Sequence, residues 1–173
     1  METEKRKTGV YPDYFYNYIK LVENENLGDA LKNQIPEIQS FFSSIDEEKR
    51  DYKYAEGKWT IKEVLQHIID TERIFAYRAL AFARKDVNTL PSFDENSYAK
   101  NSNADKRNWN ELTEELMAVR KTTDFLFNSF SEEQLNTVGK ASSYEMSVKA
   151  LGYTIAGHLA HHVNVLKERY LKV

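Results

Sequence analysis

Apolar side chains recur at helical spacing along most of this chain. In its second half, one stripe repeats at alternating intervals of four and three residues: Leu112, Leu116, Val119, Thr123, Leu126 and Phe130. Because an α-helix turns once in about 3.6 residues, this stripe covers one face of a helix. It predicts a helix from about Asp105 to Ser129. A further apolar face predicts a last helix from Ser147, its expected N-cap, to about Leu171.

An earlier helix has a clear start. Thr60 is followed by Glu63, the spacing of a capping box, and the apolar pattern continues to about Lys85. The polar stretch from Asp86 to Ala104 follows and contains Pro91. Fully extended, its 19 residues reach roughly 60 Å, whereas a helix of ~26 residues is about 39 Å long. The connection is therefore long enough to place the next helix parallel to this one.

The first helix of the set is expected from about Asp29 to Ile45, with Asp29 as N-cap. Pro36 lacks a backbone N–H, so it either kinks this helix or marks its real start, and both alternatives stay open. The aromatic segment 11–22 is ambiguous, and residues 136–146 are expected to form a loop. Four amphipathic helices without a convincing strand predict an all-α four-helix bundle.

Composition narrows the class of protein. The chain has 173 residues, which suits one domain over 1–173, with residues 1–10 expected to be flexible. A net charge of -3 argues against a nucleic-acid partner, and the absence of cysteine excludes disulfides and cysteine-based metal sites. No apolar run approaches the ~18 residues of a membrane span, and the charged start, Met1 to Lys7, is not followed by a signal-peptide core. We therefore expect a cytoplasmic protein with no membrane partner.

Histidine placement is the most informative chemical feature. The four histidines are His67, His158, His161 and His162. His158 and His162 are one helical turn apart, so their imidazoles point the same way, which is how a helix supplies two nitrogens to one metal ion. His162 falls within the apolar arc of the last helix, His158 at its edge, and His161 further towards solvent. The same spacing also occurs in helices that bind no metal, so a partly exposed pair is the alternative.

A metal site with chemistry usually needs three protein ligands and an open position. His67 is the only histidine outside the last helix, and it lies in the second turn of the helix that starts at Thr60. Its angular position is more than about 90° from the apolar centre of that helix. Since a bundle helix contacts two neighbours, this flank is still able to face the bundle interior.

Two carboxylates are candidates for catalysis. Glu72 lies near the centre of the apolar face, where a carboxylate needs a partner or a raised pKa. It is either a general base or an acid next to the metal or, as we slightly favour, the partner of an arginine or of a free N–H at a helix end. Asp70 is a candidate to orient the imidazole of His67. The alternative is a solvated charge, which is the more common role of an aspartate on a helix. The segment 91–98 mixes carboxylates with aromatics and is either the cover of a pocket or an exposed crossover.

Two motifs resemble a known family. The segment from Gly57 to Arg73 reads GKWTIKEVLQHIIDTER, and the segment from His158 to His162 reads HLAHH. Together they resemble the DinB/YfiT-like superfamily, whose second helix has a signature of the form GKW(S/T) followed by HL.D.E and whose last helix carries histidines four apart. The match runs in order from about Tyr11 to Tyr170.

The resemblance implies more than the residues do alone. It implies an up-down-down-up bundle, in agreement with the long crossover between the second and third helices. It also implies a three-histidine site of His67, His158 and His162 for a divalent ion, zinc or nickel first, with iron or manganese as alternatives. Members often form homodimers. Relatives include bacillithiol-dependent S-transferases, thiol-dependent isomerases and proteins described only as metal-dependent hydrolases.

The leading hypothesis is therefore a metal-dependent enzyme that acts on a small molecule. The ion would activate either water, for hydrolysis, or a low-molecular-weight thiol, for transfer to an electrophile. Such a thiol would be a cosubstrate, because the chain has no cysteine. The alternative is a non-catalytic metal-binding or structural helical dimer. A closed site with Glu72 or Asp70 as fourth ligand would favour it.

Overall fold

A capping box begins the longest helix, as the sequence predicts. In the computed structural model, which describes residues 7–173, helix α4 spans Ile61–Ala83. Thr60 Oγ1 accepts a hydrogen bond from the backbone N–H of Glu63 at 3.0 Å, and the Glu63 carboxylate accepts one from the backbone N–H of Thr60 at 2.7 Å. Two of the free N–H groups at the helix start are thus satisfied.

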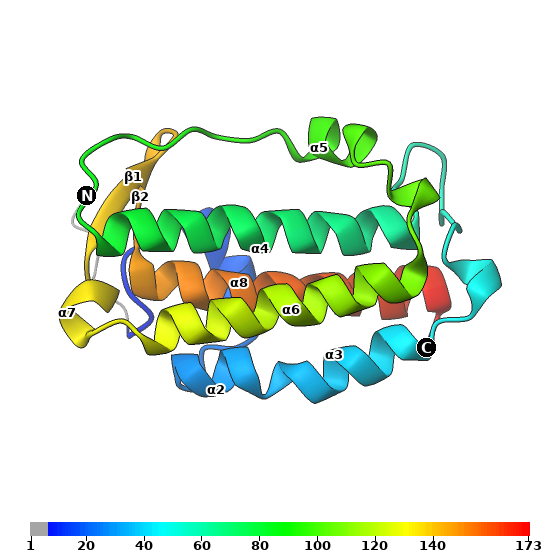
Figure 1. The fold of residues 1–173 in the computed structure, drawn as a ribbon, viewed down its shortest axis with the longest axis horizontal. Helices are drawn as coiled ribbons and strands as arrows, with labels where there is room; N and C mark the ends of the chain where they lie inside the picture. The colour runs from blue at the N-terminus through cyan, green and yellow to red at the C-terminus, as the bar shows by residue number, and fades with distance from the viewer. Residues whose placement is uncertain (1–6) are drawn as a thin grey trace.

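Three further helical segments complete the bundle (Figure 1). They are α2 with α3 (Leu27–Lys32 and Gln34–Ser43), α6 (Trp109–Asn128), and α8 (Val148–Val165) with its π-helical extension Leu166–Leu171. Shorter elements lie around them: α1 (Asp13–Ile19), 3₁₀ turns at Glu47–Lys49 and Ala104–Lys106, α5 (Glu95–Asn101), α7 (Glu132–Leu135), and strands β1 (Val138–Ala141) and β2 (Tyr144–Ser147).

The four segments run up, down, down and up. In Figure 1, α3 and α8 run in one direction and α4 and α6 in the other. Residues 84–94 and α5 pass along the length of the bundle beside α4, so that α6 starts at the same end as α4. The predicted bundle and its long crossover are both confirmed.

The first bundle segment differs from its prediction. α2 begins at Leu27, and Asn26 is its N-cap, because Asn26 Oδ1 accepts the backbone N–H of Asp29 at 3.0 Å. The prediction of Asp29 as N-cap was therefore wrong. The helix also breaks after Lys32, since a continuous helix would need an N–H from Pro36 to the Lys32 carbonyl. Pro36 instead lies in the first turn of α3, where a missing N–H breaks no intrahelical bond.

Three elements lie in segments expected to be loop or left open: α1, α5 and the β1–β2 hairpin. The hairpin pairs Ala141 with Tyr144 across a two-residue turn, and Ser142 adopts a positive φ of 54°. Such turns usually carry Asn-Gly or a similar pair. Here the turn is Ser142–Ser143, so the usual sequence signal is missing.

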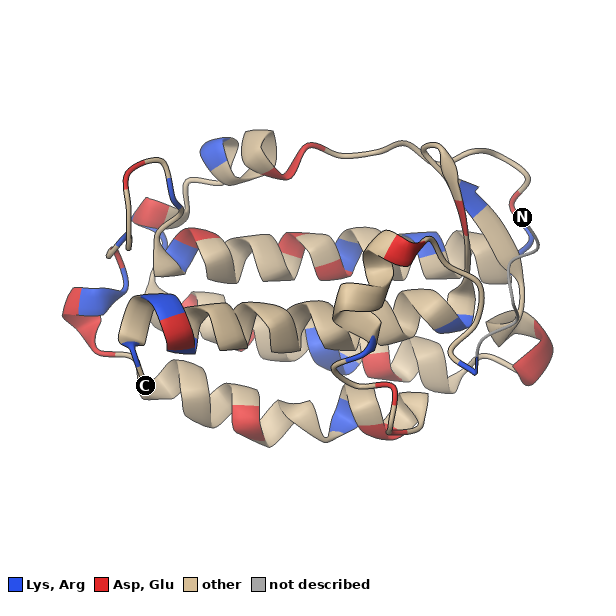
Figure 2. Cartoon of the chain, turned by 180° about the vertical axis from the view of Figure 1, so that it is seen from behind, with Lys and Arg blue, Asp and Glu red and all other residues tan. Residues whose placement is uncertain are grey.

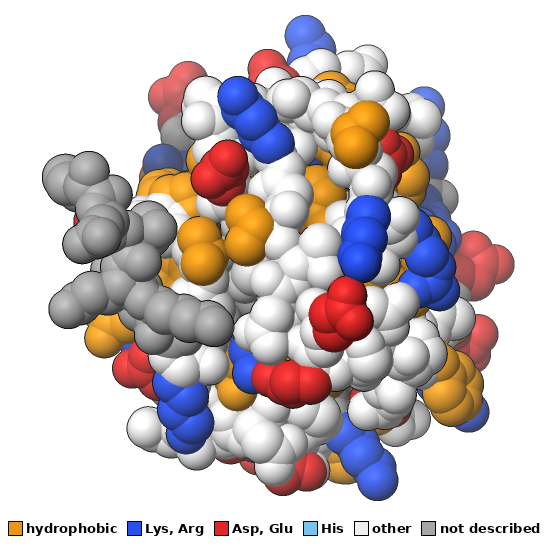
Figure 3. Space-filling view, turned by 90° about the vertical axis from the view of Figure 1, so that its left-hand side faces the viewer, with side chains coloured by type: hydrophobic (Ala, Val, Ile, Leu, Met, Phe, Trp, Pro, Cys, Tyr) orange, Lys and Arg blue, Asp and Glu red, His pale blue; other side chains and the backbone are white. Residues whose placement is uncertain are grey.

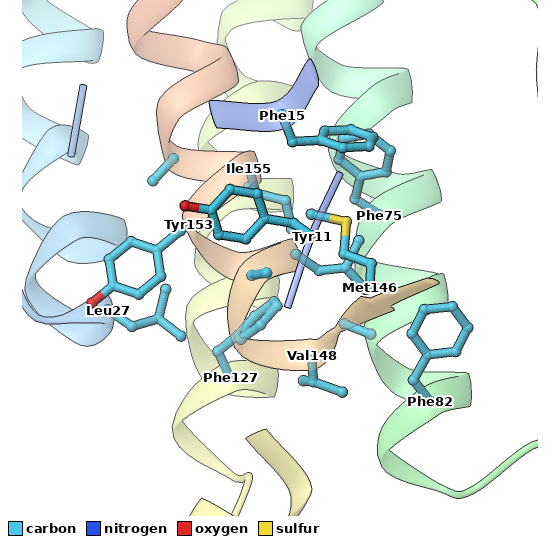
Figure 4. Close-up of a cluster of buried hydrophobic side chains, with 14 of the residues drawn as sticks. Tyr11, Phe15, Leu27, Phe75, Phe82, Phe127, Met146, Val148, Tyr153 and Ile155 are labelled. Carbon is cyan, nitrogen blue, oxygen red and sulfur yellow. The ribbon is translucent and has the colours of Figure 1, made fainter. Parts of the chain in front are cut away.

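Buried apolar side chains form two clusters, one at each end of the bundle. The cluster at the hairpin end is shown in Figure 4, and it includes Phe75 and Phe82 from α4, Phe127 from α6 and Met146 from β2. The other cluster includes residues of all four bundle segments: Phe42, Leu65, Trp109, Leu116 and Leu159. The two clusters are separated by a buried polar layer that includes Glu72 and Arg120.

The surface carries both signs of charge. Lys and Arg positions are interspersed with Asp and Glu along the helices in Figure 2, and the face at the hairpin end mixes both with hydrophobic side chains in Figure 3. Within the described chain, no helix combines the length and apolarity needed to cross a bilayer. Residues 1–6 of the segment expected to be flexible lie outside the described residues. Val10 is hydrogen-bonded to Ser147 through both backbone N–H and carbonyl.

Candidate metal centre

Three imidazoles converge between α4 and α8. The Nε2 atom of His158 lies 3.1 Å from Nε2 of His67 and 3.1 Å from Nε2 of His162. One ring nitrogen from each of the three residues lies within 4.8 Å of the others. The structure thus brings together the three histidines that the sequence analysis selected, while their assignment as metal ligands remains a prediction.

Helix packing explains why His67 faces inward. Its position is well away from the most apolar line of α4, but its side chain is buried, at 9% relative exposure. α4 packs against both α8 and α6, and the crossover with α5 runs along a further side of it. A helix covered on several sides buries its flanks as well as its apolar stripe. Sequence spacing alone gives no measure of this coverage.

Burial keeps the cluster neutral. It lowers the pKa of His67 to about 4, with a smaller contribution from the charge of His161. Burial also lowers the pKa of His158 and His162 well below 6.5, and charge repulsion among the neighbouring imidazoles adds to the effect. Near neutral pH each ring therefore keeps a nitrogen lone pair, which is the form that coordinates metal.

Neighbouring side chains hold these rings. The Thr71 hydroxyl lies 3.4 Å from Nδ1 of His67, one turn along α4, so that an Nδ1–H tautomer leaves the Nε2 lone pair directed at the cluster. The Trp59 ring packs on His67 at a centroid distance of 4.8 Å, and the Tyr18 ring packs edge-on against His158 at 5.4 Å. Orientation by a polar neighbour and two aromatic contacts pre-organises the site.

The donor set fits a divalent metal ion. Tetrahedral ligands at about 2.0–2.1 Å from zinc lie roughly 3.3 Å from one another, close to the two N···N distances of 3.1 Å. Nδ1 of His162 is buried and has no hydrogen-bond partner among the described residues. Within residues 7–173, no carboxylate joins the three histidines as a fourth ligand.

A cavity of about 560 Å³ opens onto the three histidines. Its walls come mainly from α1, α4, α8, the crossover and the tip of the hairpin. Besides the histidines, the lining residues are Pro12, Tyr14, Phe15, Tyr18, Trp59, Thr71, Phe75, Arg78, Ser92, Phe93, Glu95, Ser142, Ser143 and Tyr144. Ser92, Phe93 and Glu95 belong to the segment 91–98. This segment therefore covers part of a pocket, which was one of its two interpretations.

The two carboxylates considered for catalysis, Glu72 and Asp70, lie outside the histidine cluster and the cavity wall. Glu72 forms a buried ion pair with Arg120 at 2.8 Å, which agrees with the favoured interpretation of Glu72 as an arginine partner. Asp70 accepts a hydrogen bond from Gln66 at 2.9 Å, whereas the neighbour of His67 Nδ1 is Thr71. The proposed orienting role of Asp70 is therefore not supported by its position. Neither carboxylate lines the cavity.

His161 is half-buried and stays outside the cluster, as expected. Its ring contacts Tyr18 at a centroid distance of 5.3 Å and His162 at 5.1 Å. Burial lowers its pKa as well, followed by the effect of the nearby Arg169 cation. It is thus a neighbour of the three converging rings and offers a matched control for each of them.

Tyr18, Arg78 and Tyr144 are among the cavity residues that the sequence analysis missed. A signal for Arg78 existed, because His67, Thr71, Phe75 and Arg78 repeat at intervals of four, four and three along α4. Tyr18 and Tyr144 lie in elements that were left open or expected to be loop. Their place in the site depends on how α1 and the hairpin pack, which local spacing does not reveal.

Comparisons with known proteins agree with this architecture. The family described as the DinB superfamily matches residues 30–166. Among solved structures, the chain is similar to YfiT from Bacillus subtilis, described as a probable metal-dependent hydrolase with an unusual four-helix bundle topology. That likeness has a TM-score of 0.73 and 13% identity, and covers 95% of this chain and 90% of the other. No curated protein matches the chain.

Proposed function

Because this chain belongs to the DinB superfamily, we propose that it is a divalent-metal-dependent enzyme that acts on a small molecule. The observation that carries the proposal is the convergence of three neutral imidazoles, two of them buried and that of His162 half-buried, at the wall of a cavity of about 560 Å³. Closely packed histidines that burial keeps uncharged, next to a cavity, are a costly arrangement without a ligand.

His67, His158 and His162 would hold the ion. When bound, it would act as a Lewis acid and lower the pKa of a water or thiol in the cavity. Thr71 would fix the tautomer of His67 through Nδ1. Trp59 and Tyr18 would shield the imidazoles from bulk water and keep them neutral.

Two reaction classes follow from such a site. Hydrolysis is supported by the description of YfiT, which shares the fold. Thiol transfer to an electrophile, of the bacillithiol type, is supported by the cavity wall itself. Among the described residues, the only carboxylate lining the cavity is that of Glu95, which is exposed on α5. Hydrolysis usually uses a buried general base, whereas a thiol with a pKa near 8.5 needs less help to ionise.

Nitrogen ligands support zinc or nickel as the ion, with iron or manganese as alternatives. A non-catalytic, structural metal site would normally be closed by a fourth protein ligand. The three-histidine set and its adjoining cavity support an open position instead. We further propose a cytoplasmic homodimer with a small-molecule substrate and no nucleic-acid or membrane partner.

The proposal is tested by elemental analysis of untagged protein. We expect about one zinc or nickel ion per chain in the wild type, loss of most of it in His158→Ala, and retention in His161→Ala, which changes a neighbouring histidine outside the cluster. Far-UV circular dichroism checks that both variants fold. A wild type that contains no metal and takes up neither added zinc nor nickel would refute the enzyme proposal. Assays of ester and electrophile substrates, with and without an added thiol, then separate hydrolysis from thiol transfer.

A further inference from the structure

Arg78 is a buried cation without a buried counterion. Its side chain is 3% exposed and lines the same cavity as the three histidines. Its Nη1 donates to the Tyr144 hydroxyl at 3.0 Å and its Nη2 to the Pro91 carbonyl at 2.7 Å, and both acceptors are neutral. Across residues 7–173, no carboxylate forms an ion pair with it.

The other buried arginine of the described chain, Arg120, has the carboxylate partner that Arg78 lacks. Arg120 is fully buried and donates to both carboxylate oxygens of Glu72, at 2.8–3.2 Å. A buried guanidinium costs free energy unless an anion compensates it. Arg78 has neutral acceptors and packs on the rings of Phe75 and Phe93 at 5.5 Å and 6.0 Å. These contacts offset only part of that cost, and N–H groups of the guanidinium remain available.

Arg78 and the histidines occupy opposite ends of one stripe. His67 and Arg78 lie 11 residues apart on α4 and share a face with Thr71 and Phe75. Eleven residues span about 16 Å of helix axis. The guanidinium packs on the ring of Phe75, which lies three residues nearer to the histidines on the same face. The distance suits a small molecule with two functional ends and an apolar or aromatic body.

We propose that Arg78, together with the Tyr144 hydroxyl, binds the carboxylate of the small molecule that this cavity accepts. The aromatic rings of Phe75 and Phe93 would contact its body, and its opposite end would reach the histidines. Among the described lining residues, Arg78 is the only Lys or Arg. One buried cation balances a single negative charge, which favours a carboxylate over a phosphate dianion. Only the role of the opposite end rests on the function proposed above.

Arg78 also joins α4 to the crossover and the hairpin, and a purely structural role predicts no anion preference. Calorimetric titration of 3-phenylpropanoate and its neutral amide into EDTA-treated protein separates the two roles. We expect the wild type and Arg84→Met to bind the acid at least about tenfold more tightly than the amide. Arg84 is an exposed arginine of the same helix end and does not line the cavity. Arg78→Met should lose the preference, and Tyr144→Phe should reduce it.

Several results would overturn the proposal: no binding or no preference in the wild type, or a preference that survives in Arg78→Met. If Arg78→Met does not fold, an unchanged preference in Tyr144→Phe is the refuting result. Displacement of the acid by equimolar inorganic phosphate would refute the choice of a carboxylate. Metal-free protein keeps this test independent of the metal proposal. The preference for the acid could instead appear only after zinc is added and persist in Arg78→Met. This result would place the carboxylate at the histidines, and it would refute the role of Arg78 while leaving the metal proposal intact.

Discussion

The individual histidines connect burial to acid–base behaviour. Burial lowers the pKa of His67 to about 4 and also lowers the pKa of His158 and His162 well below 6.5. Each ring therefore stays neutral in the folded protein at a pH where the same ring in an unfolded chain is protonated. The property that prepares these side chains to coordinate a metal also makes the metal-free protein sensitive to acid.

Acidification should destabilise the metal-free protein through these rings. An unfolded histidine takes up its proton near pH 6.5, whereas folded His67 does so only near pH 4. Below about pH 6.5 the unfolded state binds more protons, so the free energy of unfolding falls as the pH falls until the folded rings are protonated too. Each ring contributes up to about 1.4 kcal/mol per pH unit in this window.

Urea denaturation of EDTA-treated protein between about pH 7 and pH 5.5 measures the effect. The variant His67→Gln removes one of the titrating rings, so its stability should fall less steeply with acid than that of the wild type. Parallel pH profiles for the two proteins would contradict the prediction.

Among the elements, α1 and α8 make an unusually close crossing. A Cβ atom built on Gly157 of α8 would lie 2.1 Å from the backbone carbonyl oxygen of Tyr18. This approach requires glycine at a helical position, where alanine would otherwise stabilise the helix by about 1 kcal/mol. The crossing also places the Tyr18 ring against His158 at the edge of the cavity.

Gly157→Ala should therefore destabilise the protein by about 1–3 kcal/mol, because the new methyl group pushes α1 away from α8. Gly28→Ala in α2 is the matched control, since a Cβ atom built on Gly28 would lie 3.6–3.7 Å from its nearest neighbours outside the helix backbone, which is ordinary contact. The control should leave stability unchanged or raise it by up to about 1 kcal/mol. Urea denaturation measures both. Equal effects of the two substitutions would show that the close approach to Tyr18 has no energetic consequence.

At the scale of the whole molecule, one buried polar network joins the four bundle segments. Arg120 of α6 donates to Glu72 of α4 and to Gln34 of α3, and Gln34 Nε2 donates to the Ala156 carbonyl of α8 at 3.0 Å. The network lies between the two apolar clusters. Since each polar group needs its partner, it favours one relative position of the helices.

Arg120→Met should destabilise the protein by about 3–5 kcal/mol, because it leaves the Glu72 carboxylate buried without a cation. The double variant Glu72→Leu/Arg120→Met should recover most of that loss. Arg73→Met is the control: it breaks the exposed pair of Arg73 with Glu115, also between α4 and α6, and should cost less than about 1 kcal/mol. Chemical denaturation ranks the variants. Loss of metal from a folded double variant would contradict a purely structural role for Glu72.

Local sequence features determined much of this protein. Helical periodicity predicted the bundle, the capping box at Thr60 predicted the start of α4, and the length of the polar stretch after it allowed the crossover. The spacing of His158 and His162 also fixed their shared face, because residues one turn apart on a helix always point the same way. Each of these features depends on neighbours in the sequence.

Contacts between distant segments decided the rest. The burial of His67 depends on how α4 is rotated against α8 and on the crossover that covers it, and the place of Tyr144 depends on a Ser142–Ser143 turn without the usual turn residues. Arg78 became a candidate ligand-binding residue only when the structure placed it in the cavity wall with no ion pair among the described residues. Sequence spacing defines which side chains share a helix face. Only the packing of remote elements decides what that face meets, because the rotation of one helix against another is set by side chains far apart in the chain.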